Sequence, residues 1–563
     1  MERDGDGRGV RGGTRAGSQP LTATPRQKRL TLVACILSSA IVFVDGTVVN
    51  VALPAISDDL DAGLATQQWV IESYLLMLGS LILIGGSLSD LFGRRRVFAL
   101  GVGGFGATSV LCAVAPSAEL LIAARALQGV AGALLVPSAL AVIVSTFEPS
   151  ERGAAIGSWT AWSGVSTLIG PFLGGVLVDA VSWRLVFAIG LLPIAATLYL
   201  IARHVPRAID HRLDRHVDVP GAVLCAVGLS GVVFALIEQP SYGWSDPLVG
   251  LPLVVGAICL ALFLLQERRS PDPMLPLGLF RRRNFAAGNA ATFLIYGGLG
   301  GAFFFMPIFL QGVAGFSAAK AGLALVPMTI VMFLLAKRFG ALADRIGARP
   351  LMSLGPLVAT AGILLLLRLD EDTSSLTDVV PAVLAFGLGM SMVVAPLTAS
   401  VLADADGEHA GIASGVNNAI SRVAGLVAIA AVGALVASWF GSALDERLDA
   451  ASGVSPAARA AAADAKARPL DPQPPPPGLP ATQRELIESA VGDASVEAFR
   501  FAASASALLM LLGGVVSAAG MTRPRREVPC AECPGGALVG APEDVARVAE
   551  APRRLPEPAG APG

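Results

Sequence analysis

Four ionisable residues stand inside long apolar stretches of the sequence: Asp45, Glu72, Arg125 and Arg422. A charge within a membrane-spanning helix costs several kcal/mol unless it is paired or hydrated, so each of these residues is a functional candidate. Burial favours the neutral form of a carboxyl group, whereas a nearby cation favours its ionised form. A carboxyl beside an arginine can therefore hold or release a proton as its access to water changes.

The depths of three of these residues predict that they share one region. With a helix rise of about 1.5 Å per residue, Asp45 lies roughly 14 Å below the outer end of its apolar stretch, Glu72 roughly 5 Å and Arg125 roughly 9 Å. All three lie in the outer half of one predicted six-helix bundle, so contact among them is feasible. We expect Asp45 to carry the proton, Arg125 to tune it and Glu72 to be a second acid. Glu72 could alternatively face the outer lipid headgroups.

The composition indicates an integral membrane protein. Of the 563 residues, 54% are hydrophobic and 15% are charged, and a soluble domain has nearer a quarter charged residues. A membrane span needs about 20 apolar residues. Fourteen predicted spans satisfy this requirement: 30–54, 69–89, 97–115, 119–144, 154–179, 183–203, 219–238, 247–266, 285–311, 318–337, 350–368, 378–402, 411–437 and 499–520.

A short charged hairpin occurs twice in the chain. The first copy follows an apolar stretch and reads Gly-Ser-Leu-Ser-Asp-Leu-Phe-Gly-Arg-Arg-Arg over 86–96, and the pattern G-x-L-x-D-x-x-G-x-R returns at 340–349. A repeat at a fixed offset indicates a protein of two similar halves, as in many transporters. The residues that carry the pattern are Gly86, Asp90, Gly93, Arg94, Arg95, Asp344 and Arg349.

This hairpin resembles the loop between helices 2 and 3 of the major facilitator superfamily, although Leu91 stands where the family often has a basic residue. The resemblance implies that the loop is a cytoplasmic latch between two rocking halves. The alternative is a simple topogenic turn, with its positive charges inside.

Four further stretches resemble the fourteen-helix drug:proton antiporters of that superfamily. Asp45 begins Asp-Gly-Thr-Val-Val-Asn-Val-Ala-Leu-Pro, similar to the helix 1 signature, and Arg125 begins a stretch similar to the helix 4 motif, whose arginine the family ties to proton transfer. The segment Gly411 to Asn418, through Arg422, also matches. The helix 5 motif of antiporters is matched, with Ser166 in place of one glycine, by Gly157, Gly170, Pro171, Gly174 and Gly175. Small residues there predict close helix packing.

The predicted architecture is an all-α major facilitator fold, two six-helix bundles plus two inserted helices. Lys and Arg in alternate loops, with an even number of spans, place both termini in the cytoplasm. The Ala- and Asp-rich loop 438–498 is predicted to lie outside and to form no packed core, apart from a short amphipathic helix over 481–497. The predicted units are a disordered tail 1–29, a bundle 30–203, basic loops with two linker helices 204–284, a second bundle 285–520 and a disordered tail 521–563.

We expect a proton-coupled antiporter of the cytoplasmic membrane, acting as a monomer, that exports small amphipathic compounds such as drugs. Cavity candidates are Asn50, Gln128, Asn417, Asn418 and Arg422, although the asparagines could equally hold helices together. No phosphate-binding loop, metalloprotease, hydrolase or nucleic-acid motif is present, so we expect no enzyme activity, metal, cofactor or nucleic-acid partner. The alternatives are an uptake carrier or lipid translocator of the same fold, and a transport-inactive sensor or scaffold.

Overall fold

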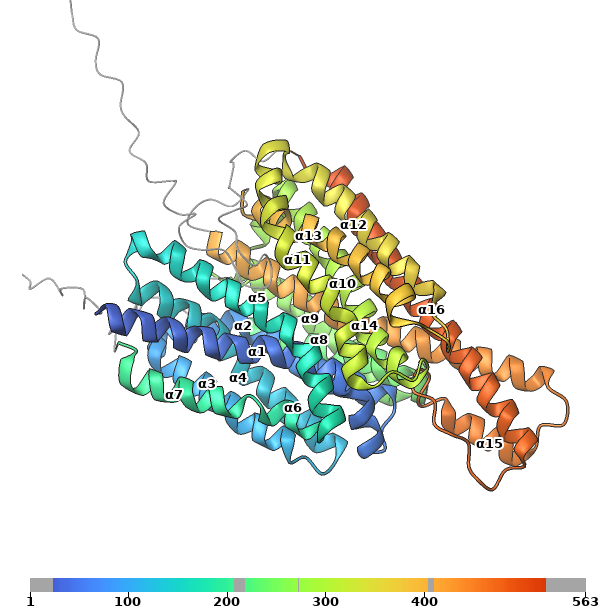
Figure 1. Ribbon diagram of the computed structural model, residues 1–563. Helices are drawn as coiled ribbons and strands as arrows, with labels where there is room; N and C mark the ends of the chain where they lie inside the picture. Colours follow the sequence, from blue (N-terminus) through green and yellow to red (C-terminus); the bar gives the residue numbers. More distant parts are fainter. Residues whose placement is uncertain (1–23, 207–217, 272, 404–409, 523–563) are drawn as a thin grey trace, which may run out of the picture.

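The computed structural model describes residues 24–206, 218–271, 273–403 and 410–522, and these residues are mostly helical (Figure 1). Side chains such as Ser117 and Ser317 accept hydrogen bonds from the first turns of the helices that follow them, as N-caps do. The helices are α1 (Pro25–Asp59), α2 (Leu64–Phe92), α3 (Arg94–Ala113), α4 (Ala118–Thr146), α5 (Pro149–Ala180), α6 (Arg184–Ala188), α7 (Leu191–His204), α8 (Val219–Tyr242), α9 (Pro247–Arg269), α10 (Arg283–Gly312), α11 (Ala318–Ile346), α12 (Ala348–Leu365), α13 (Val380–Ala403), α14 (Ala410–Ala450), α15 (Pro456–Ala465) and α16 (Ala481–Gly520).

The predicted all-α membrane fold is confirmed, with a difference in the number of spans. Within the described residues, 12 helical segments are long and apolar enough to cross a membrane, and α6 and α7 together make one of them. Helix α2 is a thirteenth span if its two parts, which bend by 55° between Ile82 and Ile84, are counted as one. The one remaining predicted span, 154–179, corresponds to α5, a 32-residue helix whose apolar part, Ile169–Ala180, is short. Gly and Ser residues make the first half of α5 less apolar than a typical span.

Two bundles account for most of the packing. Helices α1 to α7 form the first bundle, in which α4 packs on α2 and α3, and α5 packs on α1 (Figure 1). Helices α10 to α14 and α16 form the second, in which α10 packs on α16 and α13 packs on α11 and α12. The two bundles meet where α5 crosses α11 and where α2 crosses α14. We call these two crossings the seam.

The inserted helices α8 and α9 form a hairpin that lies against both bundles. The two helices pack on each other, and α8 also contacts α2 and α14. Trp69 of α2 donates a hydrogen bond to Glu238 of α8 at 2.8 Å. Many large side chains of α9, such as Leu251, Val254 and Ile258, are exposed, as expected for a helix that faces lipid.

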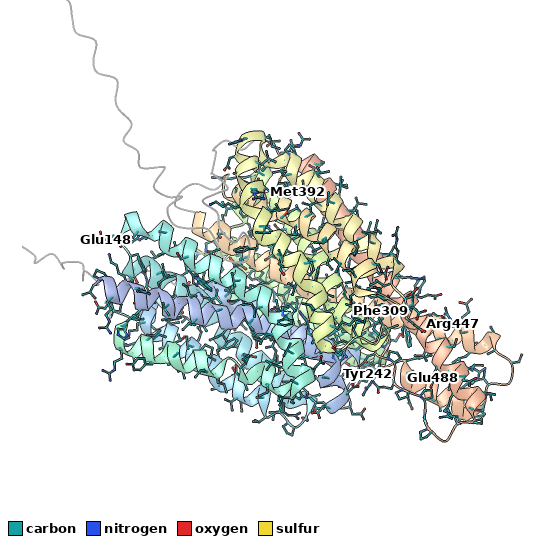
Figure 2. The ribbon with its side chains drawn as sticks, viewed as in Figure 1. Glu148, Tyr242, Phe309, Met392, Arg447 and Glu488 are labelled. Carbon is teal, nitrogen blue, oxygen red and sulfur yellow. The ribbon has the colours of Figure 1, made fainter. Side chains whose placement is uncertain are left out.

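The expectation that 438–498 forms no packed core is wrong. Helix α14 runs on to Ala450, α16 begins at Ala481, and residues 451–480, including α15, join them; we call 451–480 the strap. Ala458, Leu470 and Leu479 of the strap are buried in the same apolar cluster as Val491 of α16. Alanine has the highest helix propensity, so an Ala-rich segment forms helices that need only a few apolar anchors. Charged residues such as Arg447 and Glu488 lie at this end of the molecule, and Glu148 lies at the opposite end (Figure 2).

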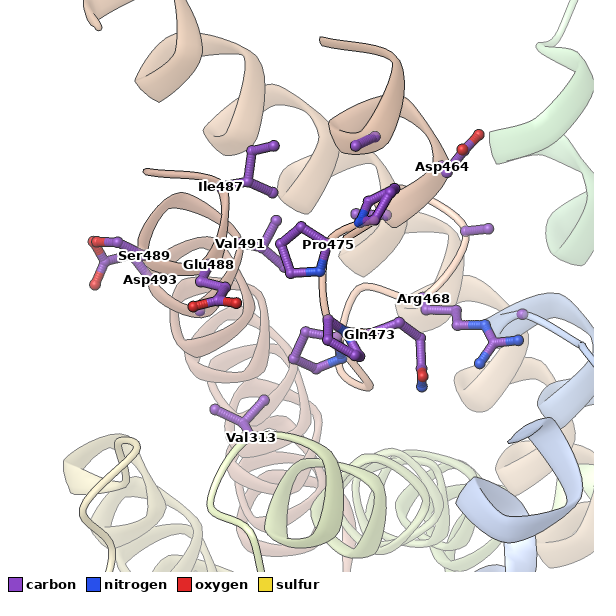
Figure 3. A pocket seen from close by; sticks show the side chains of 18 of the residues that line it. Val313, Asp464, Arg468, Gln473, Pro475, Ile487, Glu488, Ser489, Val491 and Asp493 are labelled. Atoms are coloured by element: carbon purple, nitrogen blue, oxygen red, sulfur yellow. The ribbon is translucent and has the colours of Figure 1, made fainter. Parts of the chain in front are cut away.

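The strap belongs to the second bundle but binds the turn between α1 and α2 of the first. Arg468 donates hydrogen bonds to Asp58 at 3.2 Å and to Asp61 at 2.8 Å, and Gln473 donates to Asp58 at 2.9 Å. The amide of Leu64 donates to the carbonyl of Ala467 in the strap, at 2.9 Å. Figure 3 shows Arg468 extending from the strap toward the first bundle. The strap therefore ties the two bundles together at one end of the molecule, which we call the strap end.

Docking of the strap should depend on pH through Asp471. Burial, together with the charge of Asp58, raises the pKa of Asp471 to about 6, against the effect of Arg468. The pKa of an aspartate in an unfolded chain is about 3.9. Between about pH 3.9 and pH 6, Asp471 therefore holds a proton in the docked strap that it has lost in the free strap. Docking should therefore weaken as the pH rises from 4 to 7. We expect hydrogen exchange of residues 466–480 to quicken over this range in the wild type, beyond its intrinsic rise, and to lose this excess in Asp471→Asn. An equal excess in both proteins would contradict this assignment.

Candidate functional site

Asp45 and Arg125 form a buried ion pair in the first bundle. Arg125 Nη1 lies 2.6 Å from Asp45 Oδ2, and both side chains are almost fully buried. Gln128 joins them: it accepts from Arg125 Nη1 at 2.7 Å and donates to Asp45 Oδ1 at 3.2 Å. Arg125 Nε donates to the carbonyl of Val70 at 3.0 Å. The predicted neighbours are thus in direct contact, and we call Asp45, Arg125 and Gln128 the coupling cluster.

The helices fix this geometry. Arg125 and Gln128 are three residues apart on α4 and so share one face of that helix, which packs on α1 and α2. The guanidinium carbon of Arg125 lies 4.3 Å from the ring centre of Tyr74 on α2, a cation–π distance. Removing one partner of a buried ion pair costs roughly 3–5 kcal/mol, so this cluster is sensitive to any change of charge. Such a pair can exchange a proton when water or substrate reaches it.

Glu72 lies apart from the coupling cluster. It is fully buried, and neither of its carboxyl oxygens accepts a hydrogen bond from any described residue. It follows Gln68 by one turn on α2, and Gln68 donates to the carbonyl of Ile429 on α14 at 2.8 Å. Glu72 therefore stands on the face of α2 that meets the second bundle, and it does not reach the outer surface.

The cavity candidates divide among different surroundings. Asn417 of α14 donates to Asn289 at 3.1 Å and to Thr292 at 2.8 Å, so it joins α14 to α10 inside the second bundle. Asn418 accepts from Arg422 Nε at 3.2 Å. Gln128 belongs to the coupling cluster, and Asn50 is half-buried on α1. The sequence interpretation missed Tyr74 and the Val70 carbonyl, since neither a tyrosine nor a main-chain oxygen stands out in an apolar stretch.

Most residues of the helix 5 motif lie at close helix contacts. A side chain at Gly170 or Gly174 would overlap Thr47 or Val48 of α1. Gly175 lies against Ala318 of α11, where an added Cβ would overlap the main chain. Pro171 lies against Gly322 of α11 in the same way. Gly157 has open space around the position of a Cβ. Four of the five motif residues thus allow contact between α5 and either α1 or α11.

The two latch hairpins have the same local form. Gly93 and Gly347 both have positive φ, 94° and 88°, which explains glycine at these turns. Arg94 Nη2 lies 3.3 Å from Asp90, and Arg95 donates to the carbonyl of Ala202 at 2.8 Å. In the second hairpin, Arg349 donates to the carbonyl of Ala518 at 3.0 Å. Arg95 and Arg349 therefore each tie the hairpin to another helix of the same bundle in this state.

A test of the latch is the variant Asp90→Ala. The Asp90–Arg94 pair is partly exposed and joins the end of α2 to the start of α3, and exposed pairs contribute only about 0.2–1 kcal/mol, so the fold should tolerate its loss. The family resemblance implies that this hairpin acts as a latch when the two bundles move, so we expect slower turnover with substrate affinity nearly unchanged. The measurement is equilibrium binding beside initial transport rates. A collapse of binding, with normal turnover for each bound molecule, would contradict the latch assignment.

Two helical bundles, a seam between them and ionisable groups buried at membrane depth together define the class of membrane transporters. Residues 35–429 match the Major Facilitator Superfamily, and the chain belongs to that superfamily. The predicted family and the transporter class are thereby confirmed.

Relatives of the chain are named as resistance and export proteins. The chain is 39% identical over 409 residues to the puromycin resistance protein pur8 of Streptomyces alboniger, covering 71% of this chain and 80% of that protein. It is 34% identical over 427 residues to the multidrug resistance protein Stp of Mycobacterium tuberculosis (strain CDC 1551 / Oshkosh), covering 76% and 79%. It is 32% identical over 491 residues to the tetracenomycin C resistance and export protein of Streptomyces glaucescens, covering 86% and 90%.

Solved structures support the same fold at low identity. A bacterial homologue of the human lysosomal transporter Spinster superposes with a TM-score of 0.59 at 15% identity, covering 89% of this chain and all of that one. An auto-inhibited peptide transporter of the POT family gives a TM-score of 0.57 at 14% identity, covering 90% and 100%. At these identities the likeness concerns the fold alone.

Proposed function

We propose that this chain is a proton-coupled antiporter that exports small amphipathic compounds, such as antibiotics, from the cell by alternating access. The names of its relatives, which refer to puromycin resistance, multidrug resistance and tetracenomycin C export, support export rather than uptake. The observation that carries the coupling is the buried pair of Asp45 and Arg125. Asp45 would hold the proton, and Arg125 would stabilise the ionised state after release.

Glu72 is proposed as a second acid on the seam. It is buried on the face of α2 that meets α14, so relative movement of the bundles would change its exposure to water. A carboxyl that alternates between buried and hydrated surroundings changes its proton affinity. This role is separate from that of Asp45, because Glu72 makes no hydrogen bond to the coupling cluster.

We place the protein in the cytoplasmic membrane as a monomer, with both termini in the cytoplasm and the strap outside. The division at 30–203, 204–284 and 285–520 follows the two bundles and the inserted hairpin. Exposed arginines at the latch hairpins, opposite the strap end, agree with the positive-inside rule. The strap and the contacts of α5 with α11 then close the outer side in this state.

The experiment that tests the function compares cells with and without the protein. Cells that make it should tolerate higher concentrations of some compounds from a panel of antibiotics and metabolites, and should accumulate less of them. Inverted membrane vesicles should take up the same compounds when a proton gradient is imposed. Higher accumulation in cells that make the protein would instead indicate an uptake carrier, and no change across the panel would oppose export.

A further inference from the structure

Arg422 is a second membrane-embedded arginine, and its surroundings differ from those of Arg125. It lies on α14, 12 residues beyond Ala410, or roughly 18 Å along the helix at about 1.5 Å per residue. Its Nε donates to the neutral side chain of Asn418 at 3.2 Å. No carboxylate among the described residues pairs with it, whereas Arg125 pairs with Asp45. Arg422 is also only half-buried, whereas Arg125 is fully buried.

Arg422 stands where three helices meet at the seam. A Cβ built on Gly79 of α2 would lie 3.5 Å from Arg422 Cβ, so α2 and α14 are in van der Waals contact at this point. A Cβ built on Gly300 of α10 would lie only 2.9 Å from Gly425 Cα of α14, so α10 and α14 are in close contact one turn along α14 from Arg422. The charge of Arg422 interacts with the phenols of Tyr74 on α2 and Tyr296 on α10. Gly297, next to Tyr296, packs on Ala424 of α14. Both bundles therefore contribute to its surroundings.

These surroundings are rich in hydrogen-bond donors. Tyr296 is 5% exposed, and its hydroxyl has no hydrogen-bond partner among the described residues. The guanidinium carries further N–H groups besides the one bound to Asn418. Glu72 does not pair with this charge, because neither of its carboxyl oxygens accepts a hydrogen bond from a described residue, and it precedes Gly79 by seven residues on α2, roughly 10 Å along the helix. The coupling cluster does not balance it either, because Asp45 is already paired with Arg125.

We propose that Arg422, with the hydroxyl of Tyr296, binds an anionic oxygen of the transported compound, so that the preferred substrates are amphipathic acids carrying a carboxylate or phenolate. This inference rests on the proposed export function and names the chemical class of its substrate. A carboxylate supplies acceptors for both the guanidinium and the phenol, and a hydrogen bond between charged groups is stronger than one between neutral groups. A site near the membrane midplane, between the two halves, is where such transporters bind their substrates.

The experiment uses three probes that share one fluorophore: N-dansylglycine, its uncharged methyl ester and the cationic N-dansylethylenediamine. Binding to the purified full chain in detergent is measured by fluorescence titration. We expect wild type to bind dansylglycine about tenfold more tightly than the ester, as a charged hydrogen bond predicts, and the amine most weakly. Arg422→Gln should bind the acid and the ester equally, whereas Arg422→Lys should keep part of the preference because it keeps the charge.

Two further variants make the result specific. Tyr296→Phe removes only a hydroxyl and should lower the preference by a few-fold, so it tests the site even if Arg422→Gln folds poorly. Arg338→Gln is the matched control, because Arg338 is exposed on α11, and it should behave as wild type. The proposal would be overturned if wild type bound the acid and the ester equally, or bound none of the probes. It would also be overturned if Arg422→Gln melted at the wild-type temperature and kept the wild-type preference for the acid.

The outcome separates this site from the export function. If wild type prefers the acid in binding but no imposed proton gradient drives any compound into vesicles, the anion site stands and proton-coupled export fails. If a proton gradient drives transport while wild type shows no preference for the acid, export stands and the anion site fails.

Discussion

Replacing Asp45 with asparagine should abolish proton-driven export while leaving the protein folded. The side chain keeps nearly the same volume, and its amide can still accept a hydrogen bond from Arg125, but it cannot release a proton at physiological pH. Arg125 then loses its counter-charge at a buried site, and removal of one partner from a buried pair costs roughly 3–5 kcal/mol. The variant should therefore be less stable as well as uncoupled.

The double variant Asp45→Asn/Arg125→Gln separates coupling from stability. Removing both charges restores neutrality in the buried cluster, so the double variant should melt at a higher temperature than Asp45→Asn. Coupled residues commonly deviate from additivity by about 0.5–3 kcal/mol. Proton-driven uptake into inverted vesicles should nevertheless stay absent in both proteins. Asp449→Asn is the control, since Asp449 is exposed at the end of α14 and should not affect coupling. Normal uptake by Asp45→Asn would remove Asp45 from the mechanism.

Replacing Gly175 with valine should disfavour closure of the strap end. A side chain at Gly175 would overlap the main chain of Ala318, so α5 and α11 could not approach as they do here. Gly322→Val should act in the same way, because Gly322 lies against Pro171 from the other side of that crossing. Overpacking of a close contact costs about 1–3 kcal/mol, and 1.4 kcal/mol changes an equilibrium about tenfold. We expect the closed state to lose population by about that factor and transport to slow accordingly.

The measurement is the distance between spin labels at Val181 and Leu376, obtained by double electron–electron resonance. Both positions are highly exposed near the strap end, on opposite bundles. The distances should lengthen in Gly175→Val and in Gly322→Val. Gly157→Val is the matched control on the same helix, because Gly157 has no atom near the position of its Cβ. If Gly175→Val and Gly157→Val gave the same distances and the same transport rates, close packing at the α5–α11 crossing would not control closure.

The sequence predicted most of the spans and the contact of Asp45 with Arg125 because both follow from simple rules. Long apolar stretches must cross the membrane, and two opposite charges at similar depth in one bundle lower their cost by pairing. The contacts of Gly170 and Gly174 with α1, and of Gly175 with α11, follow from the need for small residues where helices touch. The same rule does not explain Gly157, which has open space around it.

Other features depended on tertiary contacts that no local pattern reveals. The strap packs through a few apolar anchors and through Arg468 binding Asp58 and Asp61, which lie more than 400 residues earlier in the chain. Depth alone placed Glu72 with Asp45, but helix rotation directs it to the seam instead. The role of Asn417 as a link between α14 and α10 also needed the partners, Asn289 and Thr292, to be known.

The central claim is that export of compounds is driven by protons through Asp45. The direct measurement uses purified protein in liposomes with an acidic interior, and a compound that loses potency against cells making the protein. On imposition of the pH gradient alone, wild type should concentrate the compound inside while the internal pH rises, and Asp45→Asn should equilibrate the compound without concentrating it and without proton movement. Concentration of the compound by Asp45→Asn, or by wild type with no proton movement, would contradict the account.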